Sequence, residues 1–389
     1  MRGSSKHREG AVRAAICAVI VAGAAGAAAA GTNSAAQSVT VPPTAPGRLV
    51  GIGDEQPRMF ASPYFKALHV RIARMTVSWD AALNQRSNLG RADVWVRTAA
   101  RANVEPLISL SYTRGCYTSK GTVPHLAKCR LPTVATYRRA FLALRDRYPE
   151  VRDWSVWNEA NHRSEPTFND PRRAAEFYNV VKANCPGCTI VAADVLDQPH
   201  FTSWVRQFRR YAQGPRIFGL HNYEDTNNHT SKGTRAMLAT VPGQVWLTET
   251  GGIVKFPHRP FNPKRAAAAT RFMFKLAALS SRLTRLYVYQ WTGAHRHDRF
   301  DAGLTDPSGR PRPAYYVVKR YLDGHPQPLP EGPTGPTGPT GVSGPTGPSG
   351  PSGPTGAQPG STSHPPPSSG GGSGGSGGGC PLPSLPSCP

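Results

Sequence analysis

The chain has 389 residues, a formal net charge of +23 and 38% hydrophobic residues. A chain of this length does not have to place every residue in one core, and its arginines are spread along the sequence without a basic-aromatic module, which argues against a nucleic-acid-binding protein. We interpret the positive charge as a mostly solvated surface that would also favour an acidic polysaccharide or an anionic cell wall.

Residues 1–36 predict a secretory signal peptide. Four basic residues lie within residues 1–13, an uncharged Ala-rich run covers Ala14 to Ala30, and small residues follow. This charged, apolar, small order is typical of exported chains. The alternative is an uncleaved membrane anchor, although Ala and Gly make a weak span. Residues 37–46 are interpreted as a linker, and the protein is expected to be secreted or held at the cell surface.

The predicted folded body covers residues 47–330, where short apolar runs alternate with helix-like segments. The apolar runs are Leu49–Gly53, Val70–Val77, Val104–Leu110, Trp154–Trp157, Thr189–Ala193, Ile217–Leu220, Val245–Thr248 and Leu286–Gln290. Eight such alternations predict an α/β fold, a (β/α)8 TIM barrel, rather than an open doubly wound sheet. No Gly-rich phosphate loop follows any of these runs, so we expect no nucleotide cofactor.

Six cysteines beyond Cys17 fall into three close pairs. They are Cys116 with Cys129, Cys185 with Cys188, and Cys380 with Cys388. An even number at short spacing in an exported chain predicts local disulfides. The Cys-Pro-Gly-Cys motif of the second pair also occurs in redox sites, but a reactive thiolate favours a helix N-terminus and this pair follows a helical stretch. The third pair forms either a local disulfide or bonds between chains.

In a TIM barrel, functional side chains gather where the strands end. Seven residues occupy such positions here: Arg74, Asn158, Glu159, His221, Tyr223, Glu249 and Trp291. A buried carboxylate such as Glu159 costs free energy unless it is paired or used. Two carboxylates in different environments can protonate a leaving oxygen and attack an anomeric carbon, so the set matches glycosidic bond cleavage. We expect the arginine and tyrosine to hold one glutamate, and the amide and indole to contact a sugar.

The order Trp157-Asn158-Glu159 after the fourth strand and Glu249 after the seventh resembles clan A of the retaining glycoside hydrolases. The segment Gly303 to Tyr316 is similar to the one before the last helix in cellulase-like family 5 and xylosidase-like family 39 members. The resemblance covers roughly Leu49 to Leu322. It implies a TIM barrel, an acid/base role for Glu159 and a nucleophile role for Glu249. It also implies substrate contacts by Arg74, Asn158, His221, Tyr223 and Trp291.

Several other residues near the strand ends have more than one interpretation. Both glutamates could pair with Arg74 for structure alone, and Tyr223 and Trp291 could be core aromatics. Three aromatics either line sugar subsites or pack in the core: Trp79, Tyr112 and Trp246. Three acidic residues are expected to be solvated: Glu165, Asp194 and Glu224. The spacing of His295, His297 and Asp298 is compatible with a metal, but no further ligand is evident, so no metal site is predicted.

The tail changes composition after Pro330. Residues 331–359 contain nine triplets with Gly first, until Pro359 ends the period. A Gly at every third position is typical of a collagen triple helix, which would make the protein a trimer, and the alternative is a single-chain polyproline spacer. Residues 360–389 are rich in Pro, Ser and Gly and are expected to be flexible.

The sequence as a whole predicts a secreted retaining β-glycosidase that acts on a polysaccharide or oligosaccharide without a cofactor. The alternative is a non-catalytic glycan-binding or cell-wall structural protein displayed on a collagen-like stalk. Both expect a carbohydrate partner and no nucleic acid, and both allow an association with the cell wall. The presence of Glu159 and Glu249 favours the enzyme.

Overall fold

The computed structural model describes residues 48–84, 86–113, 116–118, 121–122, 129–295, 297–325 and 327. The predicted leader and linker, the collagen-like repeat and the final segment with Cys380 and Cys388 lie outside these residues. In the described part of the chain, no helix is long and apolar enough to cross a membrane.

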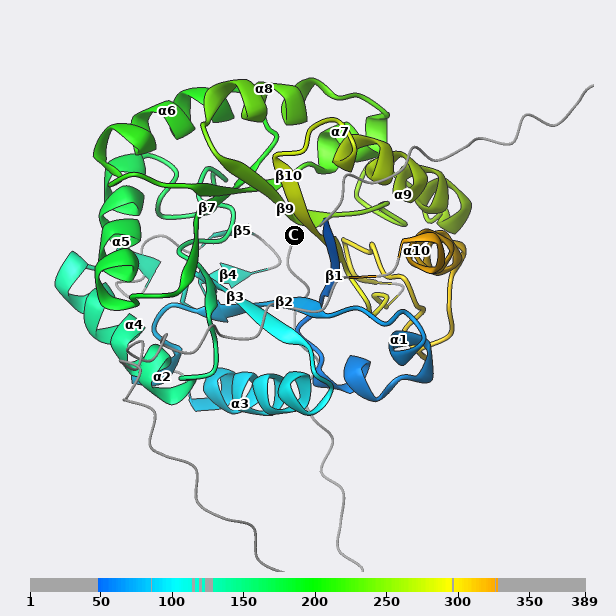
Figure 1. Ribbon diagram of the computed structural model, residues 1–389, viewed down its shortest axis with the longest axis horizontal. Coiled ribbons are helices and arrows are strands. Elements are labelled where there is room, and N and C mark those ends of the chain that lie inside the picture. Colours follow the sequence, from blue (N-terminus) through cyan, green and yellow to red (C-terminus); the bar gives the residue numbers. More distant parts are fainter. Residues whose placement is uncertain are drawn as a thin grey trace, which may run out of the picture. The chain divides into compact units, whose positions relative to one another are not determined.

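Eight parallel strands close into a barrel, and the helices surround it (Figure 1). In neighbour order the strands are β1 (Leu49–Gly53), β10 (Leu283–Tyr289), β9 (Gln244–Thr250), β8 (Ile217–His221), β7 (Thr189–Leu196), β6 (Asp153–Ser155), β3 (Glu105–Ser111) and β2 (Ile72–Ser78). The ring closes because β1 pairs with both β10 and β2. A short hairpin of β4 (Tyr117–Thr118) and β5 (Gly121–Thr122) follows β3. The predicted (β/α)8 barrel is confirmed, and each predicted apolar run overlaps one barrel strand.

The helices lie in the connections between strands. They are the 3-10 helix η1 (Pro57–Ala61) and the α-helices α1 (Pro63–Lys66), α2 (Ala81–Asn84), α3 (Arg86–Arg101), α4 (Val134–Arg147), α5 (Pro171–Asn184), α6 (Phe201–Tyr211), α7 (Tyr223–Asn228), α8 (Lys232–Thr240), α9 (Pro263–Ala277) and α10 (Pro313–Gly324). Local sequence signals set several starts. Asp170 accepts a hydrogen bond from Arg173 N at 2.8 Å and Asn262 accepts one from Arg265 N at 2.9 Å, each just before a proline that begins a helix.

The barrel interior holds a small apolar cluster of its own. It consists of Ile72, Leu107, Val191, Trp246 and Tyr287, all with 1% of their surface exposed or less. Leu49 and Ile217, the first residues of their strands, also pack against it. The cluster fills the amino-terminal half of the barrel, so Trp246 packs in the core and does not line a sugar subsite.

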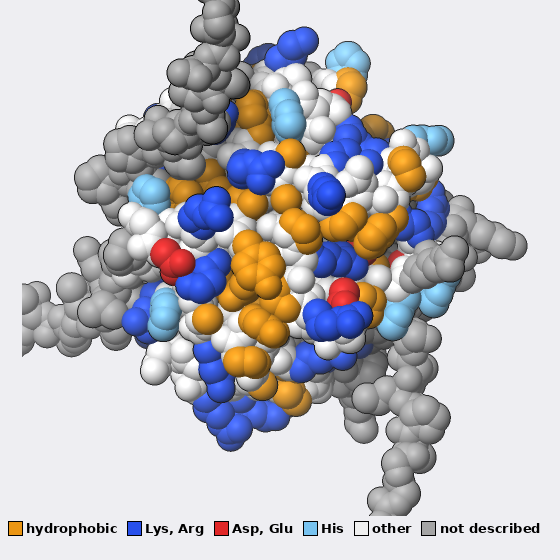
Figure 2. Space-filling view, turned by 90° about the vertical axis from the view of Figure 1, so that its right-hand side faces the viewer, with side chains coloured by type: hydrophobic (Ala, Val, Ile, Leu, Met, Phe, Trp, Pro, Cys, Tyr) orange, Lys and Arg blue, Asp and Glu red, His pale blue; other side chains and the backbone are white. Residues whose placement is uncertain are grey.

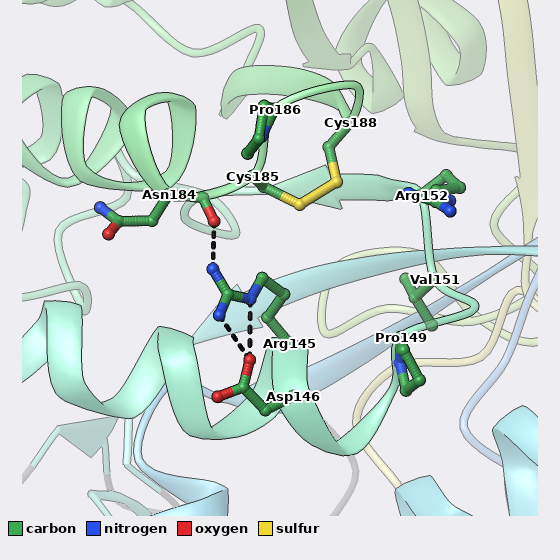
Figure 3. Close-up of a pocket in the computed structure, with 9 residues that line it drawn as sticks. All are labelled: Arg145, Asp146, Pro149, Val151, Arg152, Asn184, Cys185, Pro186 and Cys188. Atoms are coloured by element: carbon green, nitrogen blue, oxygen red, sulfur yellow. Dashed lines mark hydrogen bonds and ion pairs between the residues drawn. A yellow bond between two sulfur atoms is a disulfide. The ribbon is translucent and has the colours of Figure 1, made fainter. Parts of the chain in front are cut away.

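Both predicted disulfides that fall within the described residues are present, and the predicted Cys380–Cys388 pair lies outside them. Cys116 bonds to Cys129 in the long connection after β3, and Cys185 bonds to Cys188 directly after α5. The second disulfide forms part of the wall of a hollow of about 420 Å³ between the ends of α4 and α5 (Figure 3). In that hollow Arg145 reaches across from α4 and donates to the carbonyl oxygen of Asn184. The disulfide ties a helix C-terminus to the next strand, which agrees with a structural role.

The positive charge is spread over the surface, as the sequence predicts. On the face shown in Figure 2, Lys and Arg side chains are scattered among apolar ones, and acidic side chains are few. Many of the acidic residues lie elsewhere, at the carboxyl ends of the barrel strands. Several of these acidic side chains are buried, so the carboxyl end of the barrel gathers carboxyl groups that the outer surface does not expose.

Candidate active site

Side chains from β2, β6, β7, β8 and β9 meet at the carboxyl end of the barrel. Arg74 lies at their centre with 1% of its surface exposed. Its Nη1 donates to Glu249 Oε1 at 2.6 Å, and its Nη2 donates to Asn158 Oδ1 at 2.6 Å and to Asp194 Oδ2 at 3.0 Å. Burial alone would lower the pKa of Arg74, but the charges of Glu249 and Asp194 raise it above its usual value. The guanidinium is thus a fixed cation that orients three acceptors.

Glu249 is the more enclosed of the two glutamates. It lies within β9, one residue before the end of the strand, with 7% of its surface exposed. Besides Arg74, it accepts a hydrogen bond from the Tyr223 hydroxyl at 3.3 Å through Oε2, and the Nδ1 atom of His221 lies 3.6 Å from the same oxygen. Burial, together with the charges of Glu249 and Glu159, raises the pKa of Tyr223 well above its usual value, so this hydroxyl keeps its proton.

Glu159 enters the site from the connection after β6. Its side chain is 21% exposed, and its φ of 48° lies in the left-handed region, which non-glycine residues rarely adopt. Its Oε1 lies 3.2 Å from His221 Nδ1. A strained backbone that turns a carboxylate toward an open site is a feature often found at functional positions.

His221, at the end of β8, connects the two glutamates. The side chain is fully buried. Burial lowers its pKa, but the charge of Glu249 and the hydrogen bond with Glu159 outweigh this and raise it. One imidazole nitrogen, Nδ1, faces both carboxylates, 3.2 Å from Glu159 Oε1 and 3.6 Å from Glu249 Oε2.

Asp194 was expected to be solvated, and that prediction is wrong. The residue lies within β7 with none of its surface exposed, and Oδ2 accepts hydrogen bonds from Arg74 and from Ser109 Oγ, the latter at 2.7 Å. Burial raises its pKa, and the larger combined effect of Arg74 and its other partners lowers it below the usual value. Asp194 therefore shares Arg74 with Glu249.

Glu165 was also expected to be solvated and is instead 5% exposed, with Trp157 Nε1 donating to its Oε2 at 2.9 Å. Burial raises its pKa well above the usual value. Glu224 is exposed, as predicted. The difference arises because the connection after β6 folds back on itself and covers Glu165.

Trp291 does not join this cluster. It is 3% exposed, and its ring packs edge-on against Phe65 and Tyr315, with centroids 5.5 Å and 6.1 Å away. This packing agrees with the interpretation as a core aromatic, and a contact between Trp291 and a substrate stays a prediction. The aromatic residue at the end of β10 is Tyr289, which sequence reasoning missed. Tyr289 lies two residues after the inward-facing Tyr287. The alternation of side chains along the strand could therefore have predicted that Tyr289 also faces inward.

Two acidic residues directly after β1 were also missed. Asp54 is 3% exposed and accepts hydrogen bonds from the backbone N–H groups of Gln56 and Thr292, both at 2.6 Å. Glu55 follows it and is partly exposed. Burial, with the charges of Asp54 and Glu249 nearby, raises the pKa of Glu55 to about 7. The signal was available, since Asp54-Glu55 follows a buried strand in the same way as Asn158-Glu159.

Three of these side chains have the donor types of a metal site. One atom each of Glu159, His221 and Glu249 lie within 4.8 Å of one another. Arg74 already places a positive charge against Glu249, which disfavours a second cation there. In the second group with metal-compatible spacing, Asp298 Oδ2 accepts a hydrogen bond from the backbone N–H of His295 at 2.7 Å, and His297 is largely exposed. The geometry is that of two hydrogen-bonded carboxylates around an imidazole.

The sequence matches no protein-family model and no curated protein. Solved structures with the same fold include a GH5_18 protein from Streptomyces cattleya in complex with Manb1-4GlcNAc, which is 15% identical with a TM-score of 0.52 over 73% of this chain and 83% of that one. A GH10 protein from Paenibacillus barcinonensis is 11% identical with a TM-score of 0.51 over 74% and 97%. A beta-glucuronidase from an uncultured Clostridium sp. is 12% identical with a TM-score of 0.51 over 71% and 50%. This chain therefore shares the barrel fold of glycoside hydrolases.

Proposed function

We propose that the protein is a glycoside hydrolase that cleaves O-glycosidic bonds with retention of configuration, with Glu249 as the nucleophile and Glu159 as the acid/base. The observation that carries the proposal is the pair itself. Two glutamates from β6 and β9 direct carboxylate oxygens to within 4.8 Å of each other, across an imidazole that contacts both. Retaining enzymes hold their two carboxyl groups about 5–5.5 Å apart, whereas inverting enzymes need about 6.5–9.5 Å to admit a water molecule.

In the first step, a Glu249 carboxylate oxygen attacks the anomeric carbon while the bond to the leaving oxygen breaks. Glu159 gives its proton to that oxygen, so that the leaving sugar departs as a neutral alcohol. In the second step, Glu159 takes a proton from water as the water oxygen attacks the anomeric carbon. The bond to Glu249 breaks, and both carboxyl groups return to their starting states.

The surrounding contacts support this division of roles. Arg74 and Tyr223 hold both oxygens of Glu249, which fixes the carboxylate for attack and compensates its negative charge. Glu159 has no arginine partner among its hydrogen bonds and keeps more of its side chain exposed, as a group that must meet both a leaving sugar and water requires. His221 lies between them and orients Glu159.

Asn158 is assigned a donor role in this scheme. Its Oδ1 atom accepts from Arg74, so its Nδ2 group is the part left to face the site. An amide nitrogen can donate to a sugar hydroxyl next to the anomeric carbon, and such hydrogen bonds strengthen in the transition state. We therefore assign Asn158 to substrate binding.

The substrate is proposed to be a polysaccharide or oligosaccharide met outside the cell. The leader pattern of residues 1–36 and two disulfides in the body support export. The collagen-like segment 331–359 is proposed to display or space the barrel, and residues 360–389 to connect it further. Truncation at Pro330 is expected to leave hydrolysis of small soluble glycosides unchanged and to reduce only cell association or action on insoluble material.

The test is a screen of the full-length protein on chromogenic β-glycosides and polysaccharides, followed by NMR of the first sugar released. We expect hydrolysis of at least one β-glycoside and a β-configured first product. An α-configured first product would overturn the retaining mechanism. Binding to glycans without cleavage of any of them would favour the alternative, a glycan-binding protein displayed on its tail.

A further inference from the structure

The two glutamates divide the mouth of the barrel into unequal arcs. In the ring, β7 and β8 lie between β6 and β9 on one side, and β10, β1, β2 and β3 lie between them on the other. The shorter arc is filled, because Asp194, His221 and Tyr223 all turn inward there and contact the glutamates or Arg74. A sugar next to Glu249 must therefore lie toward β10 and β1.

Strand β1 presents glycines to the barrel interior on that side, and residues of β2 and β10 fill the space that a side chain would take there. Gly51 and Gly53 both face the barrel interior, since an added Cβ would meet Ile72 and Tyr287 at position 51 and the Tyr289 ring at 3.0 Å at position 53. Glu55 lies two residues after Gly53, so continued alternation along the chain would place it on the same face as these two glycines. The backbone N–H of Asp54 donates to the carbonyl of Arg74 at 3.0 Å, so the β1–β2 pairing continues to this point. The carboxylate of Asp54 is turned to the backbone of Gln56 and Thr292, which leaves Glu55 toward the site.

Aromatic rings form a wall beside this space. Phe300, in the connection after β10, packs against Tyr289 with ring centroids 6.3 Å apart and against Tyr223 at 5.9 Å. Phe256, from the connection after β9, packs edge-on against Phe300 at 6.0 Å and is 38% exposed. The rings extend from the tyrosine that touches Glu249 to the solvent, and they offer apolar faces to the C–H groups of a sugar.

We infer that Glu55 and Tyr289 line a pocket for the sugar that is transferred to Glu249, and that this pocket accepts a neutral sugar and rejects a uronic acid. The inference rests on the proposed function and adds the substrate class. Glu55 binds the hydroxyl groups of that sugar, while Tyr289 and Phe300 contact its apolar face.

Charge is the reason for the discrimination. Glu55 and Glu249 place two acidic groups beside this space, and the central cation, Arg74, already contacts three acceptors. A sugar carboxylate would meet the like charges of Glu55 and Glu249, whereas hydroxyl groups can donate to Glu55.

Glu55 also has the property of a residue kept for function. Its pKa is raised because burial and the neighbouring acidic groups disfavour the ionised carboxylate. Such raised pKa values are common among carboxyl groups at functional sites. Near neutral pH it is partly protonated and can both donate to and accept from hydroxyl groups.

The experiment compares full-length wild type, Glu55→Gln, Glu55→Ala and Tyr289→Ala on matched nitrophenyl β-glycosides that differ only at C6. The pairs are glucoside with glucuronide and galactoside with galacturonide. Glu150→Gln is the control, because Glu150 is exposed and precedes β6 at the opposite end of the barrel. Glu55→Gln keeps the shape of the side chain and removes its charge, so it remains informative if Glu55→Ala folds poorly.

We expect wild type to prefer the neutral member of its pair by about 100-fold or more in kcat/KM, and Glu55→Gln to narrow that preference by about tenfold. Glu55→Ala and Tyr289→Ala are expected to lower kcat/KM on the neutral glycoside by about 10- to 100-fold. A wild type that prefers a uronide, or Glu55 variants with unchanged preference and rates, would overturn the inference and leave the proposed function standing. A wild type inactive on every glycoside would overturn the proposed function and this inference with it.

Discussion

The two ends of the barrel interior use an arginine in different ways. At the amino-terminal end, Arg285 pairs with Asp153, and its guanidinium lies 4.0 Å from the centre of the Trp246 ring. Below the mouth, Arg74 pairs with Glu249 and Asp194. The first arginine is enclosed by an aromatic ring and one carboxylate, whereas the second is shared among side chains from three other strands.

This difference distinguishes a structural ion pair from a candidate active site. Asp153 is 1% exposed and Arg285 compensates its charge, so we interpret this ion pair as structural. At the mouth, Glu159 is partly exposed, has a left-handed backbone and lies beside a second carboxylate. Only the mouth combines a fixed charge with a carboxyl group that a substrate can reach, and the variants below test that contrast.

The largest effect is expected at the nucleophile. Glu249→Gln removes the attacking carboxylate while keeping its shape, so kcat on every substrate should fall by about 10⁴-fold or more. The folded state should survive, because Arg74 retains Asp194 as a partner. Circular dichroism and thermal unfolding provide the check on folding. Full activity in a folded Glu249→Gln protein would show that Glu249 is not the nucleophile.

The next effect depends on the leaving group. Glu159→Ala removes the proton donor, so hydrolysis of glycosides with poor leaving groups should fall by about 10²- to 10⁴-fold, while an aryl glycoside with a good leaving group still reacts in the first step. Added azide should then accelerate turnover and yield the β-glycosyl azide. Equal loss on all leaving groups and no response to azide would refute the acid/base assignment.

At the other end of the barrel, stability should change and chemistry should not. Arg285→Met leaves the buried Asp153 without its cation, next to Glu105, whose pKa burial and Asp153 already raise to about 7. We expect a loss of about 3 kcal/mol in the free energy of unfolding, measured by urea denaturation, with kcat/KM at 25 °C within about twofold of wild type. Arg152→Met, at an exposed neighbouring position, is the control. A large loss of activity in folded Arg285→Met would contradict a purely structural role for the Arg285–Asp153 ion pair.

The smallest effect concerns pH. The folded-state pKa of Glu55, about 7, lies above its usual value of 4.5, so the folded protein binds this proton more tightly than the unfolded chain. The free energy of unfolding therefore falls as pH rises from about 4.5 to 7. This pKa difference corresponds to at most about 3 kcal/mol, and solvent screening at the partly exposed Glu55 reduces it, so Glu55→Gln should be more stable than wild type by about 1 kcal/mol at pH 8, with little difference at pH 4.5. Thermal unfolding at both pH values measures this, and an equal change at both would contradict it.

Local patterns were sufficient for the strand order and for most candidate residues. Each apolar run bounded by turn-forming residues became a strand, because burial on both faces of a parallel barrel requires continuous apolar stretches. Glu159 and Glu249 could be placed at strand ends from the same runs. Asp194 and Glu165 could not be judged, since a carboxylate near a strand end looks the same in sequence whether it is solvated or buried.

The sequence by itself determined the barrel, because hydrophobic periodicity and chain order are local properties that only a few topologies satisfy. The site was decided by the tertiary structure. Strict alternation from Val191 and Trp246 would turn Asp194 and Glu249 away from the interior, but register shifts in the β7–β8 and β8–β9 pairings bring both inward. Closure of the ring then brings Arg74 against Glu249, 175 residues away in the sequence, and Glu55 beside the same glutamate, and no local pattern encodes such contacts.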